Sequence, residues 1–208
     1  MASPTVFLGR IGSGFLPLVA AVAVAVIPAS GTAAGAPTVT WSEPVRLSLP
    51  GHGARYPAVL ADEAGFVHVF WGDEVSGDGS SGDDGAQYVA YTRWNGYEWT
   101  YPNEILTGQG ERVAEFPAAT LDSEQRIHLV WTGQWDYYYS NALAGCAQTP
   151  RCWSEPVLIA GDSARSPWSS AIAATETTVH VVYATRGRNG RIFHVASHDD
   201  GLTWTAAT

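Results

Sequence analysis

The stretch YPAVLADEAGFVHVFW (Tyr56–Trp71) recurs twice, as FPAATLDSEQRIHLVW (Phe116–Trp131) and as SPWSSAIAATETTVHVVY (Ser166–Tyr183). Each copy has a proline, a short apolar run, a polar turn and a second apolar run in which a histidine precedes an aromatic residue. Short apolar runs between turn residues are typical of β-strands, and no helical periodicity follows the first 36 residues. Each copy therefore predicts two strands joined by a turn.

A tryptophan marks a second repeat that is out of phase with the first. It opens WSEPVRL (41–47), WTYPNEIL (99–106) and WSEPVLI (153–159), and Trp204 opens a fourth copy. A third strand, YVAYT, YYYS or FHVAS, lies between each histidine strand and the next tryptophan. Four strands in about fifty residues are the signature of a β-propeller blade.

The sequence thus predicts an all-β propeller with about three four-stranded blades. The expected boundaries are 37–208 for the partial propeller, about 54–106, 114–160 and 164–208 for its blades, and 41–47 for an extra outer strand. A closed propeller has at least four blades. We therefore expect an incomplete ring, either a fragment of a six-bladed propeller with further C-terminal blades or a chain that self-associates.

Residues 1–36 have the pattern of a secretory signal peptide. Arg10 precedes an apolar run, Phe15 to Ile27, and a small-residue stretch follows it. The run is shorter than the ~20 residues of a membrane-spanning helix, and no later segment comes closer. The sequence predicts a secreted, extracellular protein with no membrane span.

The charge of the chain bears on the class of its ligand, and its two cysteines bear on a disulfide. The chain has 20 acidic and 11 basic residues and a net charge of −9, which disfavours nucleic acid as a ligand. Cys146 and Cys152 lie close together, and an exported protein meets oxidising conditions, so we expect them to form a disulfide.

The octapeptide SHDDGLTW (Ser197–Trp204) identifies the type of propeller. Its pattern Ser197-x-Asp199-x-Gly201-x-Thr203-Trp204 resembles the Asp-box, or bacterial neuraminidase repeat, of sialidase-like propellers, and the blade pattern extends the resemblance over most of the chain after the signal peptide. The resemblance implies a turn on the face away from the active site. The residues suit a hairpin: Gly201 supplies a positive φ and Asp199 accepts hydrogen bonds from the turn. TRWNGYEW (Thr92–Trp99) is the expected counterpart in the first blade.

The same resemblance implies candidate catalytic residues. Arg55, before the inner-strand proline of the first blade, would bind a substrate carboxylate, and Asp83 or Asp84 would be the acid/base. Alternatively, the proline marks each inner strand and the flanking residue simply varies. Asp73 and Glu74 occupy the place where a second arginine is expected. The remaining catalytic residues would lie in later blades.

Loops on one face of a propeller carry its ligand site. There the acidic segment 73–84 could offer oxygens to Ca²⁺, although it lacks EF-hand spacing and a solvated loop is the simpler interpretation. Trp135 and Trp168 are candidates for stacking on sugar rings, with Arg165 beside the second of them. Three recurring histidines are expected to be structural, each hydrogen-bonded at the same place in its repeat: His68, His128 and His180.

Two functions from different classes follow. The first is a secreted, sialidase-like, non-catalytic propeller that binds a glycan or another surface ligand. The second is the N-terminal part of an exo-α-sialidase, a glycoside hydrolase. The acidic residues in place of the second arginine favour the first function. A purely structural or adhesive role is a third possibility.

Overall fold

The computed structural model describes residues 40–75, 87–107, 113–161, 167–186 and 188–208. Pro44–Thr208 form one compact unit that holds every strand of the described chain. The predicted signal peptide lies outside the described residues. In the part that is described, no helix has the length and apolar character needed to cross a bilayer.

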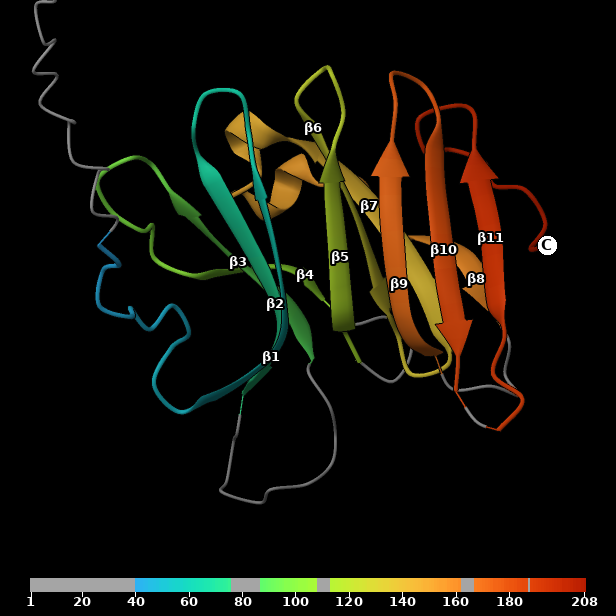
Figure 1. The fold of residues 1–208 in the computed structure, drawn as a ribbon, viewed down its shortest axis with the longest axis horizontal. Helices are drawn as coiled ribbons and strands as arrows, with labels where there is room; N and C mark the ends of the chain where they lie inside the picture. Colours follow the sequence, from blue (N-terminus) through green and yellow to red (C-terminus); the bar gives the residue numbers. More distant parts are fainter. Residues whose placement is uncertain (1–39, 76–86, 108–112, 162–166, 187) are drawn as a thin grey trace, which may run out of the picture. The chain divides into compact units, whose positions relative to one another are not determined.

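Three antiparallel sheets follow one another along the chain (Figure 1). The first sheet has the order β1-β2-β3-β4, the second β5-β6-β7-β8 and the third β9-β10-β11. The strands are β1 (His52–Ala61), β2 (Val67–Val75), β3 (Tyr88–Trp94), β4 (Asn103–Thr107), β5 (Glu115–Leu121), β6 (Arg126–Thr132), β7 (Asp136–Leu143), β8 (Val157–Gly161), β9 (Pro167–Ala174), β10 (Val179–Thr185) and β11 (Ile192–Ser197). The prediction of an all-β propeller with about three blades is confirmed.

The two copies of the tryptophan repeat near the chain ends differ. Thr205 N donates to Ala196 O at 2.9 Å and Thr208 N donates to His194 O at 3.1 Å, so residues 205–208 run beside β11 as a fourth strand would. Residues 41–47, expected as an outer strand, form no strand, and Trp41 is 93% exposed. A strand needs a neighbouring backbone to bond with, and no sheet of the described chain bonds with this segment.

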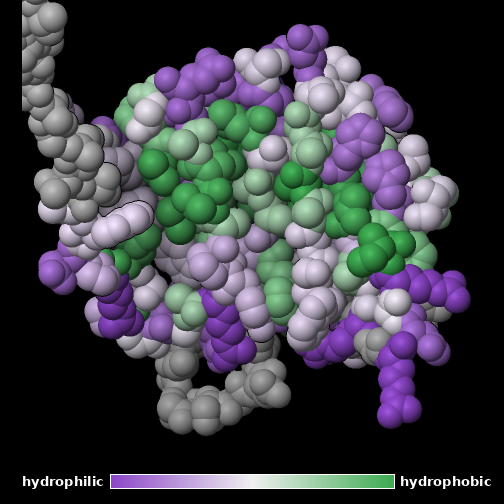
Figure 2. Space-filling model, in the orientation of Figure 1, coloured by the Kyte–Doolittle hydropathy of each residue, from purple (hydrophilic) through white to green (hydrophobic). Residues whose placement is uncertain are grey.

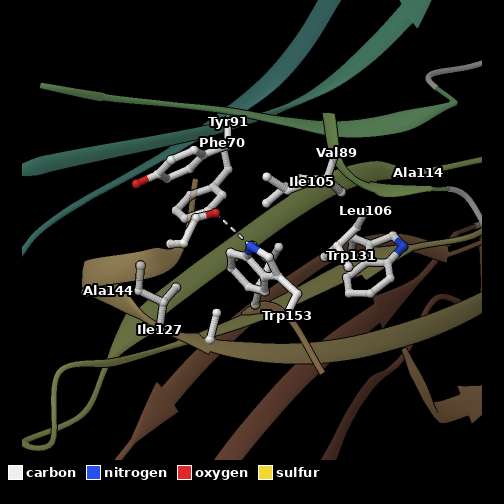
Figure 3. Packing of buried hydrophobic residues seen from close by; sticks show 13 residues of the cluster. Phe70, Val89, Tyr91, Ile105, Leu106, Ala114, Ile127, Trp131, Ala144 and Trp153 are labelled. Atoms are coloured by element: carbon white, nitrogen blue, oxygen red, sulfur yellow. Dashed lines mark hydrogen bonds between the residues drawn. The ribbon is translucent and has the colours of Figure 1, made fainter. Parts of the chain in front are cut away.

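The first two sheets share one apolar core. Phe70 and Tyr91 of the first sheet pack with Leu129 and Trp131 of the second, because alternate side chains of a strand point to opposite faces of its sheet (Figure 3). Trp153, the marker of the second blade, is buried there, and its indole Nε1 donates to the Ala147 carbonyl at 2.8 Å. Trp153 thus packs the second blade against the first.

The second and third sheets share a core of the same kind. Val130 and Tyr139, on the other face of the second sheet, pack with Val179, Val181 and Tyr183 of the third. Each sheet therefore has a front face, toward the preceding sheet, and a back face, toward the following one. The repeated positions in the sequence are therefore the positions that pack one sheet against the next.

The histidines of the first two repeats lie in hydrogen-bonded triads. His68 is bonded to Tyr91 Oη at 2.8 Å and to Asp62 at 3.3 Å. His128 is bonded to Tyr139 Oη at 2.6 Å and to an aspartate, Asp122, at 3.0 Å. Burial lowers the pKa of both imidazoles. The structural role predicted for these two is confirmed.

The third histidine departs from the pattern. Thr175 and His194 stand where the first two repeats have an aspartate and a tyrosine. His180 is exposed and its Nδ1 lies 3.0 Å from His194 Nε2. The prediction of the same bond in every repeat is wrong here, because both partners have changed.

The Ser197–Trp204 octapeptide forms the expected hairpin. Asp199 accepts hydrogen bonds from Thr203 N at 2.8 Å and Thr203 Oγ1 at 2.6 Å, and these bonds hold its pKa at about 2. Gly201 has φ of 88° and donates its N–H to Ser197 Oγ at 2.8 Å. The polar side chains at the specified positions of the motif are all bonded within the turn itself.

The first-blade counterpart of this hairpin is shorter than the sequence comparison suggested. Val67 pairs with Trp94, whereas the equivalent Val179 pairs with Ser197. Trp94 therefore takes the place of Ser197, and Thr92 lies two residues further back along its strand. The alignment of Thr92 with Ser197 was wrong because matching letters do not reveal strand register.

The two cysteines lie in short 3-10 turns between β7 and β8, η1 (Ala144–Cys146) and η2 (Pro150–Cys152). Both are free thiols in this structure. Burial and a hydrogen bond with Cys152 raise the pKa of Cys146 to about 11, so the two sulfurs are neighbours. The disulfide stays a prediction.

Candidate functional site

The connections that lead into β1, β5 and β9 and those that leave β2, β6 and β10 meet at one end of the sheets, the lower end in Figure 1. We call this end the loop face. Its described segments are 48–55, 72–75, 113–116, 132–136, 167–168, 185–186 and 188–191. The Asp-box hairpin lies at the other end, beyond the tip of β11.

Three aromatic side chains form a row across the loop face. Tyr56 of β1 stacks on Phe116 of β5, with ring centroids 3.7 Å apart and an interplanar angle of 24°. The Phe116 centroid lies 6.0 Å from that of Trp168 on β9. Tyr56 is 40% exposed and Trp168 is 47% exposed. We call Tyr56, Phe116 and Trp168 the aromatic row; it joins the inner strands of all three sheets.

An irregular backbone positions two members of the row. Tyr56 has φ of 54° and Phe116 has φ of 48°. Each lies in the first strand of its sheet, at the point where the pairing register with the second strand shifts. The following residue in each case is proline, which lacks the N–H that a regular ladder would use. Non-glycine residues in the left-handed region cost about 1–2 kcal/mol each, and such strain clusters at functional sites.

A guanidinium covers one end of the row. The Arg186 Cζ lies 4.2 Å from the centroid of the Trp168 ring, a cation–π geometry. Arg186 follows β10 directly, and the exposed Arg188 and Arg191 belong to the same connection. None of the ion pairs found in the described part of the chain involves these three residues. This connection therefore carries positive charge in a protein whose net charge is −9.

Arg55, the candidate carboxylate clamp, is engaged with a neighbour. Its Nη2 lies 3.0 Å from Glu74 Oε2, and the two side chains are 40% and 12% exposed. Asp73, beside Glu74, is bonded to His52 Nδ1 at 2.6 Å and to Trp71 Nε1 at 3.0 Å. The two acidic residues near the end of β2 thus bind groups of their own sheet.

The other sequence candidates have different outcomes. Trp135 lies on the loop face and is 44% exposed, but it makes none of the ring contacts that join the row. Asp83, Asp84 and Arg165 lie outside the described residues. Within the described residues no group of three metal-ligating side chains occurs. Residues 76–84 of the acidic segment lie outside the described residues.

The sequence analysis missed Tyr56, Phe116 and Arg186. A signal was present, because an aromatic residue precedes the inner-strand proline in two repeats and follows it in the third. The register shift that places Tyr56 against Phe116 is not visible in the sequence.

No protein-family model and no curated protein sequence matches this chain. Solved structures do match. A Dyadobacter fermentans protein of unknown function has a TM-score of 0.58 and 15% identity over 74% of this chain and 54% of its own. A Penicillium chrysogenum α-L-arabinanase, complexed with arabinobiose, has a TM-score of 0.53 and 16% identity over 74% of this chain and 48% of its own.

A Fusarium graminearum α-L-arabinofuranosidase of family GH93, also in complex with arabinobiose, has a TM-score of 0.50 and 11% identity over 74% of this chain and 48% of its own. The fold resembles that of β-propeller glycosidases. The named enzymes among these neighbours are not sialidases, and identities this low show the fold alone. The chain spans about half the length of each of these three structures.

Proposed function

We propose that this protein is a secreted β-propeller that binds a glycan at the aromatic row and does not itself turn it over. The row carries the proposal: three rings from three different blades contact one another in series on the loop face, and two of them are 40% and 47% exposed. Flat aromatic faces bind the apolar faces of sugar rings, and a rigid scaffold lowers the entropy lost on binding.

Polar groups beside the row suit hydroxyl-rich ligands. Arg186 at one end and the 40% exposed Arg55 next to Tyr56 offer N–H donors. Structural neighbours that carry arabinobiose add support from the fold, since their loops are built on the same kind of sheet. We infer a ligand longer than one sugar, because the row runs over three blades.

The contacts of the acidic residues favour binding over catalysis. A carboxyl group that acts as acid or base must reach the substrate, whereas Asp73 already binds His52 and Trp71, and Glu74 already binds Arg55. The exo-α-sialidase alternative rests on the Asp-box geometry of the Ser197–Trp204 hairpin, which concerns the type of propeller and not the catalytic residues.

The test is calorimetric titration with arabinobiose and β-1,3-galactotriose, after a glycan array has ranked ligands. Trp168→Ala and Tyr56→Ala should each weaken binding about 2- to 12-fold, because an aromatic contact contributes about 0.5–1.5 kcal/mol beyond its area. Tyr97→Ala is the matched control, since Tyr97 is 91% exposed and lies in the β3–β4 hairpin, away from the loop face. Equal loss in all three variants, or no glycan bound at all, rejects the proposal.

A fluorogenic sialoside separates the two functions. The binding function predicts no release of the fluorophore above the buffer rate. Turnover that Arg55→Ala abolishes while Tyr97→Ala retains it would instead support the sialidase alternative.

A further inference from the structure

The contact between successive sheets is built twice from the same strand positions. Phe70 and Val130 are equivalent by register, and each lies on the back face of its sheet against the front face of the next. Leu129 and Val181 are the equivalent front-face residues that receive them. The molecule therefore has one kind of inter-sheet contact, used head to tail.

The back face of the third sheet carries the same positions without a cover. Val182, equivalent to Phe70 and Val130, is 40% exposed, and Ile192 on the same face is 68% exposed. Ala171 and Ala173 of β9 are also exposed on this face. Figure 2 shows apolar and hydrophilic surface side by side over β10 and β11 on the side that faces the viewer.

The charge of this face distinguishes it from the rest of the surface. β9, β10 and β11 contain no Asp, Glu, Lys or Arg, as their sequences PWSSAIAA, VHVVYAT and IFHVAS show. Over the whole chain 15% of residues are charged. Charged residues are depleted from the centres of protein interfaces, and contiguous exposed apolar surface marks interaction sites.

The front face of the first sheet is the complementary half of the contact. Val59 occupies the position that Ala119 and Ile172 occupy in the other sheets, where both pack into the shared cores. Val59 is 67% exposed. Within the described residues no further sheet packs on either of these two faces, and on the front face of the first sheet Trp71 is buried while Val59 is not.

We propose that a second copy of this chain covers these faces, with the third sheet of one copy packed on the first sheet of the other. The two established contacts between sheets are the pattern for this one, which continues the same head-to-tail stacking. In a twofold pair, the third sheet of each copy meets the first sheet of its partner, so both open faces of both chains are covered. Such a contact is heterologous: a face binds a different face, not itself.

Sedimentation equilibrium of the purified protein tests the proposal over concentrations from about 1 to about 100 µM, the range in which such contacts are measured. A dimer or larger assembly is expected. Val182→Asp and Val59→Asp each place a carboxylate in the contact, which should weaken association about 100-fold. Leu202→Asp is the matched control, because Leu202 is 77% exposed on the hairpin at the other end of the third sheet and should leave association unchanged.

Mixing the two variants gives the sharpest result. In a pair of one Val182→Asp chain and one Val59→Asp chain, one contact contains both substitutions and the other contains neither. The mixture should therefore recover association that neither variant shows alone. If Val59→Asp does not fold, as judged by circular dichroism, Ile192→Asp keeps the back face testable against Leu202→Asp.

A wild-type chain that stays monomeric throughout the range overturns the proposal. Association that none of the face substitutions weakens, or that Leu202→Asp weakens equally, also overturns it. Recovery on mixing supports head-to-tail stacking directly, since a face that bound itself would give no such complementation.

Discussion

Gly201→Ala tests the argument that the Asp-box is a structural turn. Gly201 is buried and has φ of 88°, a conformation that costs a residue with a Cβ about 1–2 kcal/mol. A Cβ at this position would also overlap the Tyr139 ring. Tyr139 cannot move freely, because its hydroxyl lies 2.6 Å from His128 Nδ1 and its ring packs against Trp204. Overpacking of this kind adds about 1–3 kcal/mol.

Gly96→Ala is the matched control. Gly96 has φ of 98° in the equivalent hairpin of the first sheet, but a Cβ there would meet no atom within 4 Å. Both variants should lose the backbone contribution, and only Gly201→Ala should lose the additional packing contribution. The expected difference in the free energy of unfolding is about 1–3 kcal/mol.

Thermal and urea unfolding followed by circular dichroism measure this difference. For a unit of this size 1 kcal/mol corresponds to about 2–4 °C, so Gly201→Ala should melt about 2–12 °C below Gly96→Ala. Equal melting temperatures would refute the argument that Gly201 is required by the close approach of Tyr139. A glycine needed for ligand contact instead would change binding without this difference in stability.

Three further predictions concern titration, the hairpin and the cysteines. Burial lowers the pKa of His128 below its ordinary value, so below about pH 6.5 the unfolded chain binds more protons than the folded chain. The free energy of unfolding should therefore be largest above about pH 6.5 and should fall as the pH drops below it. A melting temperature that stays constant from pH 7.5 to about pH 5, or a fall that His128→Gln does not reduce, would contradict this. Hydrogen bonds from Thr203 lower the pKa of Asp199 to about 2, so the contribution of this carboxylate to stability should persist at pH 4 and disappear only as the pH falls toward about 2. In Asp199→Ala at neutral pH, hydrogen exchange at the Thr203 amide should accelerate. An unchanged exchange rate would reject the bond from Thr203 N to Asp199. After air oxidation, in which O₂ takes up the two electrons, the predicted Cys146–Cys152 bond should lower the mass by two hydrogen atoms. The oxidised protein should be more stable than Cys152→Ser by about 2 kcal/mol. Thiol titration that oxidation leaves unchanged would exclude the bond.

Local repetition explains why the blade architecture could be predicted. The proline, the histidine strand and the tryptophan each occupy a set place in the unit, and every copy packs against its neighbour through the same positions. His68 and His128 were assigned a structural role on the same ground, and their triads confirm it. His180 shows the limit, because its partners are residues from other strands that the repeat does not preserve.

The candidate site depended on cross-strand register, which a sequence does not display. Arg55 was a possible free clamp until the pairing of β1 with β2 placed Glu74 within 3.0 Å of it. Thr92 matched Ser197 in letters and not in position. Both errors have the same origin: a shift of one or two residues changes which side chain faces which partner.

The repeat pattern alone was sufficient for the strands, the blade unit and the turn role of Ser197–Trp204, since these follow from alternation and turn chemistry within a few neighbouring residues. The aromatic row required the folded molecule. Tyr56, Phe116 and Trp168 come from three blades. The first two contact one another because each has a left-handed backbone conformation at a register shift. Contacts between residues sixty positions apart depend on how the sheets pack, and packing is a property of the assembled chain.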